Sequence, residues 1–170
     1  MIRRCKKGLW DQSIPGISFN NKGISNYAEM YTKYANDHPR GEKGLDLWSD
    51  ILKKIKSDGK KRAYDCLVGV SGGTDSSYLL HFLKKSGLRV LAINLDNGWN
   101  SELATHNIQK ILETLNIDLY THVIDWNEFK NLQLSFLKCS TPDGEIPTDH
   151  AISAILYQIA SKYKIKYIIS

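Results

Sequence analysis

Residues 66–83 read CLVGVSGGTDSSYLLHFL, and this stretch decides the fold. An apolar run ends at Val70, and an apolar pattern with helical spacing begins at Tyr78. Between them lie small and hydroxyl-bearing residues with a single carboxylate, Asp75. The pattern predicts a buried strand that turns directly into a helix.

Beyond this stretch, strand and helix patterns alternate to the end of the chain. We expect strands at 66–70, 89–95, 119–124 and 165–169, and helices at 75–86, 102–115, 126–137 and 149–163. Such alternation implies right-handed βαβ units and therefore a doubly wound parallel sheet of the α/β class. The last strand runs up to Ser170, so we expect the domain 65–170 to be incomplete at its C-terminus and the chain to be an N-terminal fragment.

The first part of the chain has a different character. Residues 1–44 contain many turn formers, such as Pro15-Gly16, and few periodic apolar positions, so we expect a loop-rich N-terminal module there. Residues 45–64 form a helix and a linker in this interpretation, because Trp48, Ile51 and Ile55 are spaced as on one helix face.

Composition narrows the class of protein. The chain has 170 residues, 42% of them hydrophobic, and no apolar run long enough to cross a membrane. The charged N-terminus has no apolar segment after it that would make a signal peptide. Three widely spaced cysteines favour a reducing compartment over a disulfide framework. We therefore expect a cytoplasmic globular protein.

The net charge of +5 is unevenly distributed. Residues 1–64 hold 14 Lys and Arg against 7 Asp and Glu, whereas residues 65–170 hold 9 against 11. The basic charges are evenly spaced and form no single patch in the sequence, so a solvated surface is the simpler interpretation and we expect no nucleic-acid partner.

The turn itself has the composition of a phosphate-binding loop. Glycines let backbone N–H groups approach a ligand, and a helix N-terminus attracts anions. The candidate nucleotide-binding residues are Ser71, Gly72, Gly73, Thr74, Asp75 and Ser76. No lysine follows the glycines, so this is not the common P-loop, and the glycine spacing does not match the dinucleotide fingerprint either.

Asp75 is the informative residue of the turn. A carboxylate beside phosphates repels them unless a cation lies between, so we expect Asp75 to hold Mg²⁺. The alternative is that Asp75 only caps the helix.

The residues S-G-G-T-D-S at 71–76 resemble the S-G-G-x-D-S signature of the PP-loop ATP pyrophosphatases. The resemblance implies an adenine nucleotide alpha hydrolase-like fold and an enzyme that uses ATP and Mg²⁺. Members of that superfamily cleave ATP to AMP and pyrophosphate while adenylating an oxygen of the substrate.

Segments along the whole chain resemble a narrower family, the N-acetyl sugar amidotransferases of lipopolysaccharide O-antigen biosynthesis, whose members are about twice as long. These segments are RCKKG at 4–8, PGISF at 15–19, GISNYA at 23–28, NLDNGW at 94–99, PTDHAI at 147–152 and KYIIS at 166–170. The resemblance implies conversion of the acetamido group of a nucleotide-linked sugar to an acetamidino group, with ammonia from a separate glutaminase subunit. The alternatives are a tRNA-modifying PP-loop enzyme of the thiolation or lysidine type, or a truncated nucleotide-binding module without turnover.

Two further carboxylates are candidates. Asp96 ends the second expected strand, at the sheet edge that carries the turn. We expect it either to contact nucleotide or metal, or to be only the first residue of a loop. Asp149 stands at an expected helix start, so it is an N-cap by its position alone. The family resemblance implies a catalytic role for Asp75 and Asp149.

The chain departs from this family at one feature. The family opens with two C-x-x-C pairs, of which only Cys5 remains here, because Gly8, Ser25 and Ala28 hold the other places. A single thiolate cannot make a structural zinc site. We therefore expect a degenerate zinc-ribbon-like module without zinc.

Overall fold

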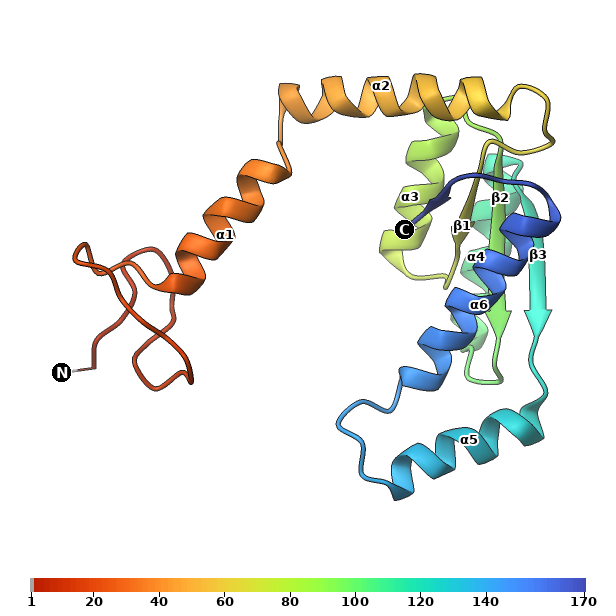
Figure 1. Cartoon of the computed structure of the whole chain (residues 1–170). Helices are drawn as coiled ribbons and strands as arrows, with labels where there is room; N and C mark the ends of the chain where they lie inside the picture. Colours follow the sequence, from red (N-terminus) through yellow and green to blue (C-terminus); the bar gives the residue numbers. More distant parts are fainter. Residues whose placement is uncertain (1) are drawn as a thin grey trace. The chain divides into compact units, whose positions relative to one another are not determined.

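The computed structural model describes residues 2–170, and the chain forms two compact units, 1–51 and 52–170 (Figure 1). No helix among the described residues combines the length and apolar character that a membrane crossing needs.

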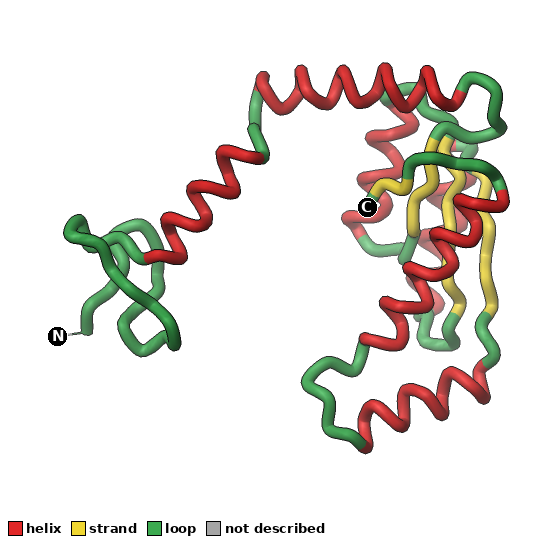
Figure 2. Tube along the Cα trace, viewed as in Figure 1, coloured by secondary structure: helices red, strands yellow, loops and turns green. Residues whose placement is uncertain are grey.

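The second unit contains a four-stranded parallel sheet (Figure 2). Its strands are β1 (Cys66–Gly69), β2 (Val90–Asp96), β3 (Asp118–Val123) and β4 (Ile168–Ile169), in the order β3-β2-β1-β4. The first and second strands lie at the centre, so their residues are buried on both faces. The predicted α/β class and parallel sheet are confirmed.

Helices cover both faces of this sheet. They are α3 (Thr74–Lys85), α4 (Glu102–Leu115) and α6 (Ile146–Lys162), whereas α5 (Trp126–Lys138) lies beyond the end of the sheet and packs against α6. Helix α3 contacts α4 and both central strands, whereas α6 packs on β1 and β2 from the other side. Figure 1 shows α6 in front of the sheet and α4 behind it.

The core beneath α6 explains why that helix is apolar. Leu67 of β1 and Leu91 and Ile93 of β2 are buried against Ile155 and Ile159 of α6. Every second residue of a strand points to the same face, and residues four apart lie on the same face of a helix. The strands and α6 therefore each present a continuous apolar surface to the other. This packing fixes the first turn of α6 at the carboxyl edge of the sheet.

The amino edge of the sheet is held by a charged pair. The Asp65 carboxylate, 5% exposed, receives hydrogen bonds from the Arg89 side chain at 2.6 and 3.1 Å and from the Arg89 backbone N–H at 2.8 Å. Arg89 also donates to the carbonyl oxygens of Gly59 and Arg62, at 2.7 and 2.6 Å. Burial raises the pKa of Asp65, but the hydrogen bonds and charge of Arg89 outweigh it and hold that pKa below its usual value.

Within residues 65–170, two element boundaries differ from the expected ones by more than one residue. Helix α6 begins at Ile146, with Pro147 in its first turn, where we expected loop up to Pro147 and a helix from Asp149. Proline suits a first helical turn because the N–H that it lacks has no partner there. Strand β4 is reduced to Ile168–Ile169, because only these residues pair with β1.

The first unit contains a helix that we did not expect. Helix α1 (Asn26–Asp37) lies within the segment predicted to be loop-rich, and α2 (Glu42–Gly59) extends the helix expected from Leu45 at both ends. The Ser25 side chain caps α1 by accepting a hydrogen bond from Ala28 N–H at 3.2 Å. Serine at this place is a helix-start signal that the sequence analysis missed.

Two of the positions at which the resembled family has cysteines, Cys5 and Ser25, are in contact in this unit. Ser25 donates to Cys5 Sγ from both its backbone N–H and its hydroxyl, each at 3.2 Å, and Cys5, Ser25 and Ala28 are all buried. Burial raises the pKa of Cys5, but the hydrogen bonds from Ser25 and Lys7 outweigh it, so the net shift is downward. Among residues 2–170, no cluster of three or more His, Cys, Asp or Glu side chains could hold a metal ion.

Candidate functional site

The turn between β1 and α3 exposes an uncapped helix N-terminus. Helices α4 and α5 are capped by the side chains of Ser101 and Asp125, whereas α3 has Gly73 at its N-cap and no side-chain hydrogen bond. The first backbone N–H groups of a helix have no partner within it. Those of α3 are therefore available to an anion, and the helix dipole favours a negative charge there.

The two glycines of the turn have different roles. Gly72 has a φ of 76°, and a Cβ at this position would collide with the backbone carbonyl oxygen of Ala104 in α4. Gly73 has a φ of −79°, and a Cβ there would meet only Ser71 Oγ at 3.5 Å. The backbone thus has a positive φ at Gly72 and an extended conformation at Gly73. The reason at Gly72 is that α4 passes directly against the turn, where Asn107 also donates to the Gly72 carbonyl oxygen at 3.3 Å.

Some polar groups of the turn hold its shape. The Ser71 backbone N–H donates to Ser76 Oγ at 3.3 Å, and the Ser76 hydroxyl donates to the Gly73 carbonyl oxygen at 3.2 Å. The Ser76 hydroxyl, expected as a ligand donor, thus bridges the turn in this structure. Thr74 and Ser77 line an open hollow of about 430 Å³, which Gly72 and Gly73 of the turn also line.

A cavity of about 350 Å³ lies beside the turn, between the carboxyl ends of the central strands and α6. Its polar lining comes from Ser71 and from five residues that we did not single out as binding residues: Asn94, Asn97, Asn100, Thr148 and Ser170. The Asn94 side chain donates to the Val70 carbonyl oxygen at 3.0 Å and so fixes the end of β2 to the start of the turn. Ligand cavities of α/β sheets lie at this edge.

Thr148, one of the residues that line this cavity, carries a buried polar atom without a partner. It is 9% exposed, and its Oγ1 finds no hydrogen-bond partner among the described residues. A buried hydroxyl without a partner costs about 1–3 kcal/mol, so such atoms in folded proteins usually serve a ligand or water. The sequence signal that could have pointed to Thr148 as a binding residue was a hydroxyl side chain at the start of an apolar helix, directly before Asp149.

The three predicted carboxylates occupy different positions. Asp75 is exposed in the first turn of α3, and it is not the N-cap. Asp149 is exposed in the first turn of α6, whose N-cap is Glu145, and it does not line the cavity that its neighbour Thr148 lines. The simple capping roles are therefore wrong for both residues, since each lies inside its helix.

Asp96 ends β2, as expected, but it is turned toward α4. Its Oδ1 accepts a hydrogen bond from Gly98 N–H at 3.1 Å, and it lines a separate cavity of about 410 Å³ with Thr105 and Ile108. The structure thus does not place Asp96 among the residues that line the cavity beside the turn. Its predicted nucleotide contact stays a prediction.

The site has a donor suited to Mg²⁺. Asp75 offers a carboxylate, and none of the hydrogen bonds or ion pairs found in residues 2–170 engages it. Mg²⁺ is commonly bound through one or two carboxylates together with substrate phosphates and waters. A single exposed carboxylate beside a free helix N-terminus fits that mode of binding.

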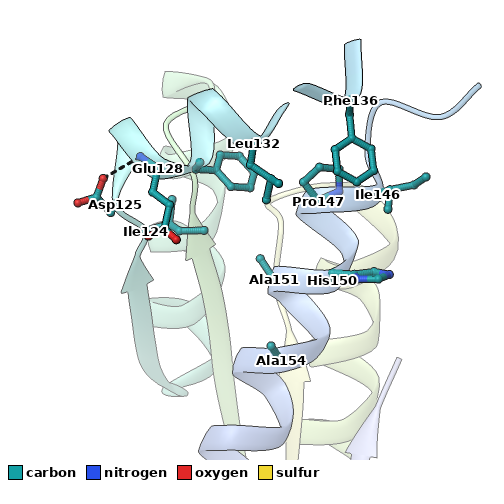
Figure 3. A pocket seen from close by; sticks show the side chains of 11 residues that line it. Ile124, Asp125, Glu128, Leu132, Phe136, Ile146, Pro147, His150, Ala151 and Ala154 are labelled. Carbon is teal, nitrogen blue, oxygen red and sulfur yellow. Dashed lines mark hydrogen bonds between the residues drawn. The ribbon is translucent and has the colours of Figure 1, made fainter. Parts of the chain in front are cut away.

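A further apolar cavity lies between α5 and α6 (Figure 3). It measures about 500 Å³ and is lined by side chains such as Phe129, Leu132 and Pro147. Asp125 at its rim already accepts a hydrogen bond from the Glu128 backbone N–H at 3.0 Å, and no residue of the phosphate turn reaches this cavity. Nothing in its lining therefore marks it as the reaction site.

Cys66 lies in β1 just ahead of the turn, fully buried. Burial raises its pKa to about 12, so its thiol is protonated at neutral pH and is no nucleophile.

Comparison with known proteins agrees with the geometry. Residues 65–156, more than half of the chain, match the family model described as "Queuosine biosynthesis protein QueC". The tRNA(Ile)-lysidine synthase of Chlamydia pneumoniae is 39% identical over 70 residues, which are 41% of this chain and 19% of that protein. The chain thus spans about a fifth of the length of this curated relative.

Solved structures share the fold. NMN synthetase from Francisella tularensis superimposes with a TM-score of 0.51 and 23% identity, over 72% of this chain and 52% of that one. Glutamine-dependent NAD⁺ synthetase from Acinetobacter baumannii, solved with adenosine diphosphate, gives a TM-score of 0.54 and 13% identity, over 89% of this chain and 29% of that one. At these identities the likeness shows the α/β fold alone.

Proposed function

Because the chain belongs to the QueC family of the PP-loop ATP pyrophosphatase superfamily, we propose that it is an ATP-dependent amidotransferase acting on a nucleotide-linked N-acetyl sugar. The supporting observation is the uncapped N-terminus of α3 beside a cavity lined by Thr148, whose buried hydroxyl has no partner among the described residues. The narrower sugar assignment rests on the sequence resemblance, and we propose a cytoplasmic location with it.

In this proposal the phosphates of ATP bind the backbone N–H groups at the start of α3. The nucleoside enters the 350 Å³ cavity, where its polar groups satisfy Thr148 Oγ1. Asp75 holds Mg²⁺, which neutralises phosphate charge when it is bound. Asn94 keeps the start of the turn fixed to β2, so the N–H groups are aligned before ATP arrives.

The chemistry proceeds in two steps. The acetamido oxygen of the sugar attacks the α-phosphorus of ATP, a P–O bond forms, and pyrophosphate leaves with the electrons of the broken P–O bond. Ammonia from a glutaminase subunit then adds to the activated carbon, AMP leaves with the former acetamido oxygen, and a proton is released to give the acetamidine. The protein contributes mainly by positioning the reactants and stabilising phosphate charge.

An isotope experiment tests this route. The chain is incubated with ATP, ammonia and a nucleotide-linked N-acetyl sugar labelled with ¹⁸O in the acetamido group. We expect the label in AMP, one AMP and one pyrophosphate per amidinated sugar, and loss of both with Asp75→Asn. Release of ADP and phosphate, or AMP without the label, contradicts the proposed adenylation.

The likeness to a tRNA(Ile)-lysidine synthase favours a second candidate, modification of tRNA. It covers a short part of that protein, and residues 65–170 here have more acidic than basic side chains, which disfavours a polyanion at this domain. Replacing the sugar by bulk tRNA in the same assay separates the two candidates, because tRNA-dependent pyrophosphate release would favour the second.

A further inference from the structure

Trp99 is exposed yet fixed in position. It follows β2 in the loop at the carboxyl edge of the sheet, and it is 67% exposed. Its indole Nε1–H donates to Gln133 Oε1 of α5 at 2.8 Å, and its backbone N–H donates to Asn97 Oδ1 at 3.1 Å. Its ring meets Trp126 edge to face, with centroids 5.5 Å apart. An anchored aromatic ring with most of its surface in solvent is a preformed stacking surface.

This ring forms one wall of a groove of about 550 Å³, within the usual range of about 300–1,000 Å³ for ligand sites. Leu134 and Leu137 add apolar surface. Gln133, Lys130 and Glu145 add hydrogen-bonding groups, and the charges of the last two cancel. The groove thus suits a neutral ring that has an apolar face and hydroxyl groups around its edge.

The groove adjoins the cavity of about 350 Å³ that we propose for the nucleoside. Asn97 lines both spaces, and Glu145 of the groove lies one helical turn before Thr148 of the cavity. A molecule in the groove is therefore next to the cavity that also contains Ser71 of the phosphate turn. An acceptor that attacks the α-phosphorus of ATP must bind in such a neighbouring position.

We propose that the Trp99 groove binds the pyranose ring of the acceptor, with the C–H face of the sugar stacked on the indole and its hydroxyls facing Gln133, Lys130 and Glu145. This assignment rests on the proposed amidotransferase function and adds the sugar subsite to it. A pyranose matches the groove better than a phosphate does, because the lining carries no net positive charge.

Binding to the full chain tests the assignment, with UDP-N-acetylglucosamine, UDP and Mg·ATP as separate probes in calorimetry. We expect Trp99→Ala to raise the Kd of the nucleotide sugar at least about tenfold and Trp99→Phe to raise it less than about threefold, since Phe keeps a stacking face. The Kd of UDP and of Mg·ATP should not change. Tyr157→Ala is the matched control, because Tyr157 is 72% exposed on α6 and lines neither space.

A second variant fills the groove without removing a contact. A Cβ at Gly144 would meet no atom within 4 Å, so Gly144→Phe should fold normally and obstruct the groove.

Saturation-transfer NMR on the wild-type protein shows which part of the nucleotide sugar is in contact. The pyranose protons should receive more saturation than the uracil protons.

The outcomes separate the subsite from the function. Suppose that Mg·ATP binds, but the nucleotide sugar does not bind, or binds Trp99→Ala as tightly as it binds the wild type. The assignment of the sugar subsite is then wrong, and the proposed ATP chemistry is unaffected. If the sugar binds through Trp99 while Mg·ATP does not bind, the subsite stands and the amidotransferase proposal fails. Contact through uracil alone, or loss of tRNA binding alone in Trp99→Ala, also overturns the assignment.

Discussion

Replacing each glycine of the phosphate turn by alanine separates backbone geometry from ligand contact. Gly72 has a φ of 76°, which costs an alanine roughly 1–2 kcal/mol. The new Cβ would also press on the backbone of Ala104, with its Cα 2.9 Å away, and such overpacking costs about 1–3 kcal/mol. The free energy of unfolding should fall by roughly 2–5 kcal/mol in Gly72→Ala.

Gly73→Ala is the matched control one residue later. The backbone there is extended and an added Cβ meets only Ser71 Oγ at 3.5 Å, so alanine is accommodated. Alanine reduces the entropy of the unfolded chain but is a poorer N-cap than glycine, and the two effects offset each other to within about 1 kcal/mol.

Thermal and urea unfolding followed by circular dichroism measure the difference. The Tm of Gly72→Ala should fall by roughly 5–15 °C, whereas that of Gly73→Ala should move by no more than about 4 °C. Equal Tm values for the two variants would show that the contact between the turn and α4 does not constrain Gly72, and would refute this account of the turn.

Four more predictions follow from individual side chains. Thr148→Val should raise the Tm, because it removes the unpaired buried hydroxyl, and it should weaken the binding of Mg·ATP. A fall in Tm with an unchanged affinity for Mg·ATP would mean that the hydroxyl already has a partner in the protein alone. Asp75→Ala should weaken binding of Mg·ATP far more than of metal-free ATP, and equal losses in calorimetry would remove the metal from Asp75. Asp65→Asn should destabilise the protein above pH ~4, the ordinary carboxyl pKa. The pKa of Asp65 is lowered in the folded state, so the loss of stability in Asp65→Asn should shrink as the pH falls through that pKa. Urea unfolding at several pH values measures this loss. If it does not depend on pH, the charge of the Asp65–Arg89 pair is not its cause. Purified protein should contain no stoichiometric zinc, and a chelator should leave its Tm unchanged; about one zinc per chain in metal analysis would contradict the hydrogen-bonded account of Cys5.

Local signals in the sequence were enough for the architecture. The apolar run before Ser71, the small residues of the turn and the helical spacing after them determine a strand, a turn and a helix without help from distant residues, because backbone sterics and burial act locally there. Alternation of such units then leaves few topologies besides a parallel sheet. The same local logic could have found α1 from Ser25, whose cap is formed within three residues.

The partners of the site depended on tertiary structure. Gly72 is constrained by Ala104, and Asn94 by Val70, at sequence distances that no periodicity reports. Gly73 and Gly72 look alike in the sequence, yet only the passage of α4 makes one of them obligatory. Thr148 could be recognised only once α6 had buried its hydroxyl without a partner, because satisfaction of a polar atom is a property of the packed chain and not of the residue.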